Sequence, residues 1–244
     1  MIRIEDYEEL KVRIVNWLKD YYWKYDIKAF VGGVSGGIDS AVVSTLCAET
    51  GFPTYVLTMP LHSKKVNTEL SEVHAKALSR KYSNVRVVNI DLSNTYESLL
   101  FDIDQDFVNN KLANANTKSR LRMVTLYQIA GSVGGIVVGT GNKVEDYGVG
   151  FYTKYGDGGV DIAPIADLYK SEVWELGEYL DVDQRIVDAK PTDGLWDDGR
   201  NDEDQIGATY VELEEAMENK TGVALNILEE YNKKNKHKME PIPT

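Results

Sequence analysis

The chain has 244 residues, a hydrophobic content of 43%, one cysteine and a formal net charge of −12. This length suffices for one sizeable core, and no apolar run approaches the ~20 residues that a membrane span needs. The acidic balance argues against nonspecific nucleic-acid binding and the N-terminal residues lack a signal peptide's apolar stretch, so we expect a single cytoplasmic domain over residues 1–244.

Regular elements are predicted along most of the chain. An amphipathic helix is predicted over Glu8–Tyr22, and strand-length apolar runs follow at Ala29–Val34, Tyr55–Met59, Val85–Ile90 and Ile136–Gly139. Helical patterns lie between these runs, over Ala41–Cys47, Thr68–Lys81 and Arg120–Val133, the last stopped by Gly134-Gly135. Alternation of this kind predicts an α/β fold, a doubly wound parallel sheet flanked by helices.

Cysteine and histidine are scarce. One cysteine excludes an intrachain disulfide, and one thiol with three scattered histidines cannot form a usual zinc site. Any metal should therefore be a hard ion bound by oxygen. Cys47 lies in an apolar helical stretch, so we expect it to pack in the core.

A small-residue turn joins the first predicted strand to the next helix. It reads Gly33-Val34-Ser35-Gly36-Gly37-Ile38-Asp39-Ser40. Free amides and the positive end of a helix dipole converge at such a helix start, and glycine lets a polyanion approach the main chain. A carboxylate beside phosphates needs a cation between them, which makes Asp39 a candidate magnesium ligand. An ordinary Gly/Ser/Asp turn is the alternative.

Two common nucleotide motifs do not fit this turn, because it lacks the lysine of a Walker loop and the spacing of a dinucleotide fingerprint. The run Gly139–Val144 half matches that fingerprint, which we interpret as coincidence. The turn resembles the pyrophosphate loop of the ATP pyrophosphatases, which split ATP between its α and β phosphates. The resemblance implies a Rossmann-like fold of the adenine nucleotide alpha hydrolase type, with AMP and pyrophosphate as products.

A second region makes the resemblance more specific. It comprises Gly139–Glu145, the glycine-rich run Phe151–Asp161, and Leu168–Val173. With the first loop, these stretches resemble ammonia-dependent NAD synthetase, and matches extend from the opening helix to the Lys236-His237-Lys238 tail. The resemblance implies a ligase that amidates deamido-NAD to NAD with ammonia and ATP, through an adenylated nicotinate carboxylate.

The resemblance also implies roles for individual residues. Asp39 and Glu145 match magnesium carboxylates, and Asp39, Lys170 and Asp161 match catalytic positions. The positions that match ATP contacts are Gly33, Val34, Ser35, Gly36, Gly37, Ile38, Asp39, Ser40, Thr140, Lys170 and Thr192. The positions that match deamido-NAD contacts are Arg120, Lys154, Asp161, His237 and Lys238. Asp157 or Asp161 is expected to help deprotonate ammonium.

Further expectations concern the reaction and the assembly. An acyl adenylate is hydrolysable, so we interpret the run from Gly148 to Gly159 as a closing lid. With Cys47 in the core, no glutaminase nucleophile is expected, and free ammonia is the expected nitrogen donor unless a separate protein supplies it. Family members are homodimers, and helices within Asn94–Val133 could form that contact.

Some features depart from the family pattern. The basic ATP contact after the second strand cannot be placed, and Lys64 and Lys65 are only candidates. One extra residue lies between Glu145 and Phe151, compared with many relatives. The acidic segment Asp193–Glu218, by contrast, follows the pattern: it holds ten acidic residues and one basic residue, and its stretch 193–207 resembles the family's acidic segment after the ATP-contacting threonine, where we expect mobility without ligand.

The sequence leaves two rival functions open. One is another adenylating amidase or thiolase, such as a GMP synthetase or a tRNA-modifying enzyme. These usually carry a dimerisation domain or basic and cysteine-rich elements, which this sequence does not display. The other is a nonenzymatic nucleotide sensor, which would be free to lose Asp39, Glu145 and Lys170.

Overall fold

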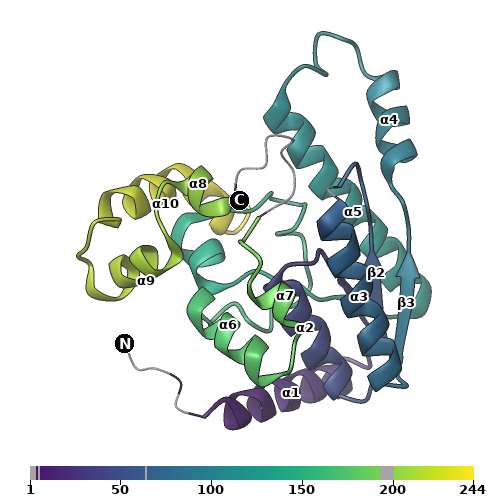
Figure 1. Ribbon diagram of the computed structural model, residues 1–244. Helices are drawn as coiled ribbons and strands as arrows, with labels where there is room; N and C mark the ends of the chain where they lie inside the picture. Colours follow the sequence, from purple (N-terminus) through teal and green to yellow (C-terminus); the bar gives the residue numbers. More distant parts are fainter. Residues whose placement is uncertain (1–3, 5, 64, 193–200) are drawn as a thin grey trace.

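The computed structural model describes residues 4, 6–63, 65–192 and 201–244. Its sheet has four parallel strands in the order β3-β2-β1-β4 (Figure 1). The strands are β1 (Phe30–Gly33), β2 (Thr54–Thr58), β3 (Val85–Asn89) and β4 (Ile136–Val137). The chain runs outward from β1 through β2 to β3 and then returns to the other side of β1. Ligands of doubly wound sheets bind at such a reversal, beyond the carboxyl ends of the strands.

Eleven helical segments are described around this sheet. They are α1 (Tyr7–Lys24), α2 (Ile38–Glu49), α3 (Lys65–Lys81), α4 (Ser93–Asp102), α5 (Lys111–Val133), the π-helix η1 (Val144–Val149), α6 (Lys170–Tyr179), α7 (Gln184–Val187), α8 (Asp202–Ile206), α9 (Tyr210–Asn219) and α10 (Leu225–Met239). Figure 1 shows α8, α9 and α10 grouped together on the opposite side of the molecule from β3 and α4.

The alternating side chains of β1 show which helices cover each face of the sheet. Phe30 packs with α1, α2 and α6, whereas its neighbour Val31 packs with residues of α4 and α5. Successive side chains of a strand point to opposite faces, so β1 is apolar on both sides and lies in the centre of the sheet. The predicted α/β class and doubly wound parallel sheet are confirmed.

All four predicted helices begin earlier than their apolar patterns, α1 at Tyr7 and α2 at Ile38. The helix expected from Arg120 begins at Lys111, because the Asn110 side chain accepts a hydrogen bond from the Ala113 amide and caps it. The helix expected from Thr68 begins at Lys65. The predicted stop is confirmed, since Gly134 adopts a left-handed φ of 65° at the C-terminus of α5.

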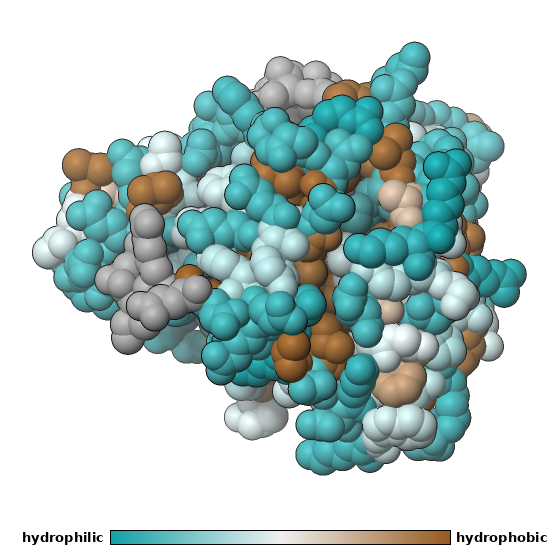
Figure 2. Space-filling view, turned by 60° about the horizontal axis from the view of Figure 1, so that its bottom comes forward, coloured by the Kyte–Doolittle hydropathy of each residue, from teal (hydrophilic) through white to brown (hydrophobic). Residues whose placement is uncertain are grey.

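The polarity of the surface and the burial of the single thiol agree with what the composition predicts. Hydrophilic residues cover most of the face in Figure 2, and hydrophobic ones form small patches between them. None of the helices in the described ranges combines the length and apolarity that crossing a bilayer requires. Cys47 is a buried free thiol, and burial raises its pKa to about 12, which confirms its place in the core.

A buried histidine of α3 faces α2. His74 is 5% exposed, and its Nε2 lies 3.0 Å from the Ser44 hydroxyl. Burial lowers the pKa of His74 from 6.5 to about 4, although the Ala41 backbone and Asp183 act in the opposite direction. The ring is therefore neutral in the folded protein at neutral pH.

The pKa of His74 predicts a pH dependence of stability. As pH falls from 6.5 to 4, the unfolded chain takes up a proton at this ring before the folded chain does, so stability is lost across that window. We expect the free energy of unfolding of the wild type to fall by about 3 kcal/mol more than that of His74→Gln over this range. Urea unfolding at several pH values measures both profiles, and parallel profiles would contradict the prediction.

Candidate active site

The turn between β1 and α2 is held by its own serines. The Ser35 amide donates to Ser40 Oγ at 3.1 Å, and the Ser40 hydroxyl donates to the Gly37 carbonyl at 2.9 Å. The N-cap of α2 is Gly37, so its N-cap residue offers no side chain to occupy the first amides of the helix. A preformed helix start with open amides suits a polyphosphate.

Position 36 requires glycine, because of its backbone conformation and its neighbours. Its φ is +92°, and a Cβ at this position would lie 2.7 Å from the Asn67 carbonyl oxygen of α3. Only glycine avoids both the left-handed strain and this contact. The loop therefore packs directly on the backbone of α3.

Two predicted magnesium carboxylates lie on either side of a buried lysine. Lys170, 2% exposed, donates from Nζ to Asp39 Oδ2 at 2.5 Å and to Glu145 Oε1 at 3.3 Å. Burial alone would lower the pKa of Lys170, but the carboxylates of Asp39 and Glu145 raise it above its ordinary value. Burial raises the pKa of Glu145, and the Lys170 charge opposes that shift. The lysine is thus charged, and it links α2, η1 and α6.

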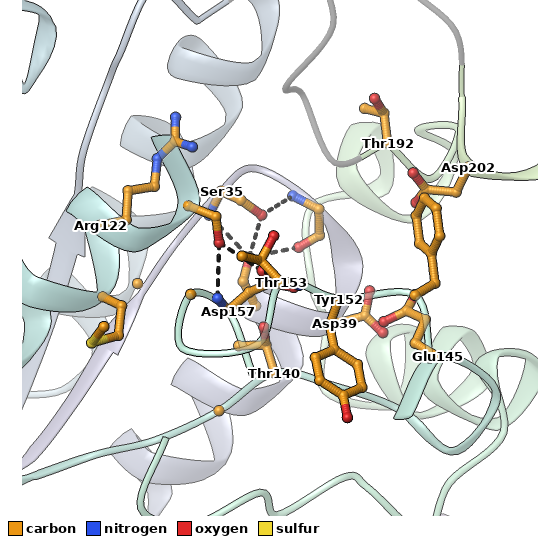
Figure 3. A pocket seen from close by; sticks show the side chains of 18 of the residues that line it. Ser35, Asp39, Arg122, Thr140, Glu145, Tyr152, Thr153, Asp157, Thr192 and Asp202 are labelled. Carbon is orange, nitrogen blue, oxygen red and sulfur yellow. Dashed lines mark hydrogen bonds between the residues drawn. The ribbon is translucent and has the colours of Figure 1, made fainter. Parts of the chain in front are cut away.

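These three residues line a cavity of about 760 Å³ (Figure 3). In this view Arg122 lies on one side and Thr192 and Asp202 on the other, with Ser35 and Asp157 between them. Of the predicted ATP contacts, those that line the cavity are Gly33, Val34, Ser35, Gly37, Ile38, Asp39, Ser40, Thr140, Lys170 and Thr192. Gly36 does not line it, and its packing on α3 explains its place in the loop.

Cationic and polar groups line another part of the same cavity. Four of the five predicted deamido-NAD contacts belong to it, namely Arg120, Lys154, His237 and Lys238. Arg120 donates to the Lys154 carbonyl at 3.4 Å, and Lys154 Nζ donates to the His237 carbonyl at 3.0 Å. Helix α5, the 151–159 loop and α10 therefore meet around one space.

Asp161 is not brought to the cavity. Its carboxylate accepts hydrogen bonds from the Tyr127 hydroxyl at 3.0 Å and from the Val137 amide at 2.7 Å, beside β4 and α5. Asp157, by contrast, lines the cavity and accepts from the Ser119 hydroxyl at 2.6 Å and the Thr153 amide at 3.0 Å. Of the two expected bases, only Asp157 faces this space.

Of the other candidates from the sequence, Lys65 does not line the cavity. Lys65 is 90% exposed at the side chain and pairs with Glu69, 3.6 Å away. Lys64 and residues 193–200 lie outside the described residues. The described remainder of the acidic segment is folded as α8 and α9.

The expected lid is held by the C-terminal helix. Lys238 Nζ donates to the carbonyls of Gly150 and Tyr152 at 2.6 and 2.8 Å, and Asn235 donates to that of Val149 at 2.8 Å. Asn232 donates to the Gly148 carbonyl at 3.0 Å. Residues 148–152 are thus anchored to α10 along their backbone.

Several residues of the site were not predicted. Arg122 lines the cavity and donates from Nε to the Met59 carbonyl at 3.2 Å, but nothing in the sequence separates it from its neighbours on α5. Tyr210 and Asp202 lie in the acidic segment, whose charge and family resemblance did not single out either residue. Asn142 lies within the Gly139–Glu145 run, and that run was the available signal.

The donor set fits a magnesium ion. Mg²⁺ is usually held by one or two carboxylates together with substrate phosphates and water. Asp39 and Glu145 supply two hard oxygen ligands beside the phosphate loop. Within the described ranges no cluster of three or more His, Cys, Asp and Glu side chains that could hold a metal ion is found.

The fold and the site together define a nucleotide-binding α/β protein with a phosphate loop, a carboxylate pair and an adjoining cationic pocket. The family model described as NAD synthase matches residues 10–242. The chain belongs to the NAD synthase family.

Individual relatives agree with this membership. The NH(3)-dependent NAD(+) synthetase of Carboxydothermus hydrogenoformans is 37% identical, over 96% of this chain and 95% of the relative. That of Finegoldia magna is 34% identical, over 96% of this chain and 94% of the relative. The solved NMN synthetase of Francisella tularensis is 35% identical, with a TM-score of 0.91 over 99% of both chains.

The packing of Gly36 leads to a matched pair of glycine variants. Gly51 also has a positive φ, +78°, but a Cβ there would meet nothing within 4 Å. We expect Gly51→Ala to lower the free energy of unfolding by about 1 kcal/mol and Gly36→Ala by a further ~1–3 kcal/mol, because only the second also collides with α3. Urea denaturation measures both, and equal losses would rule out the packing argument.

Proposed function

We propose that this chain is an ammonia-dependent NAD synthetase that amidates deamido-NAD at the expense of ATP, releasing AMP and pyrophosphate. The observation that carries the proposal is the shared cavity, in which the phosphate loop and the Arg120–Lys154 side open into one space. The names of the full-length relatives support the same reaction.

The chemistry follows from the weak electrophilicity of a carboxylate. A nicotinate carboxylate oxygen attacks the α phosphorus, and the bond to the bridging oxygen breaks to release pyrophosphate. A bound Mg²⁺ would lie at Asp39 and Glu145 and supply positive charge for the phosphates. The amides at the start of α2 and the Lys170 ammonium stabilise charge on the departing pyrophosphate.

Amide formation then completes the reaction. Ammonia attacks the acyl carbon of the adenylate, AMP leaves, and a base accepts the proton. We assign that base to Asp157, because its carboxylate lines the cavity and Asp161 is bound to Tyr127 and β4. Side chains of α10 donate hydrogen bonds to the carbonyls of Val149 and Gly150, which supports a closed loop around the reactive intermediate.

A second candidate acceptor is the nicotinate mononucleotide. The Francisella tularensis protein with a TM-score of 0.91 is named as an NMN synthetase, so its acceptor is half of the dinucleotide. The chemistry at the carboxylate is the same for both acceptors. The two differ in whether an adenylyl group must also be bound.

Product analysis tests both candidates. Purified protein is incubated with ATP, MgCl₂ and ammonium chloride, with either deamido-NAD or nicotinate mononucleotide, while amidated product, AMP and pyrophosphate are quantified together. Stoichiometric products from deamido-NAD support the first candidate, and a larger kcat/KM for the mononucleotide supports the second. AMP without an amidated nucleotide would contradict both. A parallel arm replaces ammonium with glutamine, and we expect no product there.

Loss of one phosphate-site carboxylate should abolish most activity. We expect Asp39→Asn to lower kcat by roughly 10²–10³-fold, the usual effect of removing one preorganised charge contact. Asp20→Asn, an exposed position on α1, is the matched control and should retain the wild-type rate. Unchanged turnover in Asp39→Asn would exclude its role at the phosphates.

We further propose a homodimer formed through α4 and α5. Large apolar side chains are exposed on this side, including Phe101 at 85%, Phe107 at 71% and Val124 at 56%. Asp161 accepts a hydrogen bond from Tyr127 of α5, so a dimer formed through this helix would place Asp161 close to the interface. A cytoplasmic location stays a prediction from the sequence.

A charge on this surface should separate the subunits. We expect Val124→Glu to sediment as a monomer at concentrations where the wild type is dimeric, because an unpaired charge in an apolar interface is costly. Val223→Glu, which places the same charge on an 80% exposed residue before α10, should leave the dimer intact. A dimeric Val124→Glu protein would exclude this surface.

A further inference from the structure

We propose that Asn142 and Tyr210 are positioning residues that hold Asp39 and Glu145 in a fixed relation, so that both carboxylates can bind one divalent cation. The inference rests on the proposed use of ATP with a metal ion. Neither residue belongs to the set that the family resemblance supplies.

Asn142 joins the two carboxylate positions through one amide. It is fully buried, at 0% exposure, and its Nδ2 donates to Asp39 Oδ1 at 3.0 Å. Its Oδ1 accepts from the amides of Val144 and Glu145, both at 3.1 Å. These two N–H donors require the oxygen on their side, so the amide nitrogen must face Asp39.

Tyr210 fixes the other carboxylate at its side chain. Its hydroxyl donates to Glu145 Oε1 at 2.7 Å, and its ring is fully buried. The ring also packs edge-on against Trp174 at 6.0 Å, and Lys170 Nζ lies 4.9 Å from its centroid. Glu145 also lines the cavity, so the carboxylate that Tyr210 holds faces the space where a ligand would bind.

The charge of these donors suits a cation site. Asp39 and Glu145 carry two negative charges, and Lys170 balances one of them. Asn142 and Tyr210 orient the carboxylates as neutral donors, without adding a second positive charge that would repel a cation. If Lys170 turns toward phosphates when ATP binds, these two neutral bonds are the ones that keep both carboxylates in place. Partners of this kind, beyond the direct ligands, typically change metal affinity by ~10–100-fold.

Tyr210→Phe removes only the hydroxyl and is the main test. Mn²⁺ serves as the probe, with its binding to the whole protein followed by electron paramagnetic resonance in the presence of α,β-methylene ATP. We expect Mn²⁺ to bind about 10-fold or more weakly than in the wild type. The Mg²⁺ concentration for half-maximal activity should rise in parallel, with kcat largely recovered at high Mg²⁺.

A second tyrosine provides the control. Tyr82 also donates its hydroxyl to a glutamate, Glu49, but neither residue lines the cavity. Tyr82→Phe should therefore keep wild-type Mn²⁺ affinity, even if both variants lose similar stability. Asn142→Ser is the second test, because serine can still accept the η1 amides but is too short to reach Asp39. It should weaken Mn²⁺ binding as Tyr210→Phe does.

The outcomes separate this inference from the proposed function. Wild-type Mn²⁺ affinity in a folded Tyr210→Phe protein would overturn the positioning role of Tyr210, and the same result in Asn142→Ser would overturn that of Asn142. If the wild-type protein itself binds no Mn²⁺ with the nucleotide, the metal-dependent ATP chemistry fails instead.

Discussion

The site depends on one lysine that is buried between two acids. Moving Lys170, Asp39 and Glu145 out of water has a large desolvation cost, which only close pairing can offset. That requirement brings together a phosphate loop, a π-helix and the first residue of α6. Each of these segments carries one member of the charge cluster, so none can shift without leaving a buried charge unpaired.

The surrounding contacts extend this constraint into the rest of the fold. The Glu214 carboxylate accepts from the Ser171 amide and hydroxyl at 2.9 and 2.6 Å, which joins α9 to the start of α6 next to Lys170. Tyr210 adds a contact from the same helix to Glu145. The group of α8, α9 and α10 is therefore attached to the sheet layer through the charged centre of the site as well as through apolar packing.

Much of the sheet and most of the phosphate site could be predicted from the sequence. Continuous apolar runs such as Ala29–Val34 show strands covered on both faces, and glycine with serine before an apolar helix shows a phosphate loop. The start of α5 was missed because Asn110 acts through a side-chain cap, and apolar spacing carries no signal for it. The partners of the Tyr210 hydroxyl and the Asp161 carboxylate could not be predicted in this way. Both groups meet segments that are distant in the sequence, and local patterns do not encode such contacts.

The attachment of the 148–152 backbone to α10 also affects how the molecule is made. The donors on α10 follow their acceptors by 84 to 88 residues along the chain. At a synthesis rate of about 5–20 residues per second, those carbonyls wait roughly 4–18 s for their partners. During that interval these carbonyls lack their α10 donors, although the strands and α5 have already been synthesised. The 148–152 backbone is thus one of the last parts of the cavity wall to acquire its native hydrogen bonds, and a protease or chaperone acting on the nascent chain would meet it without them.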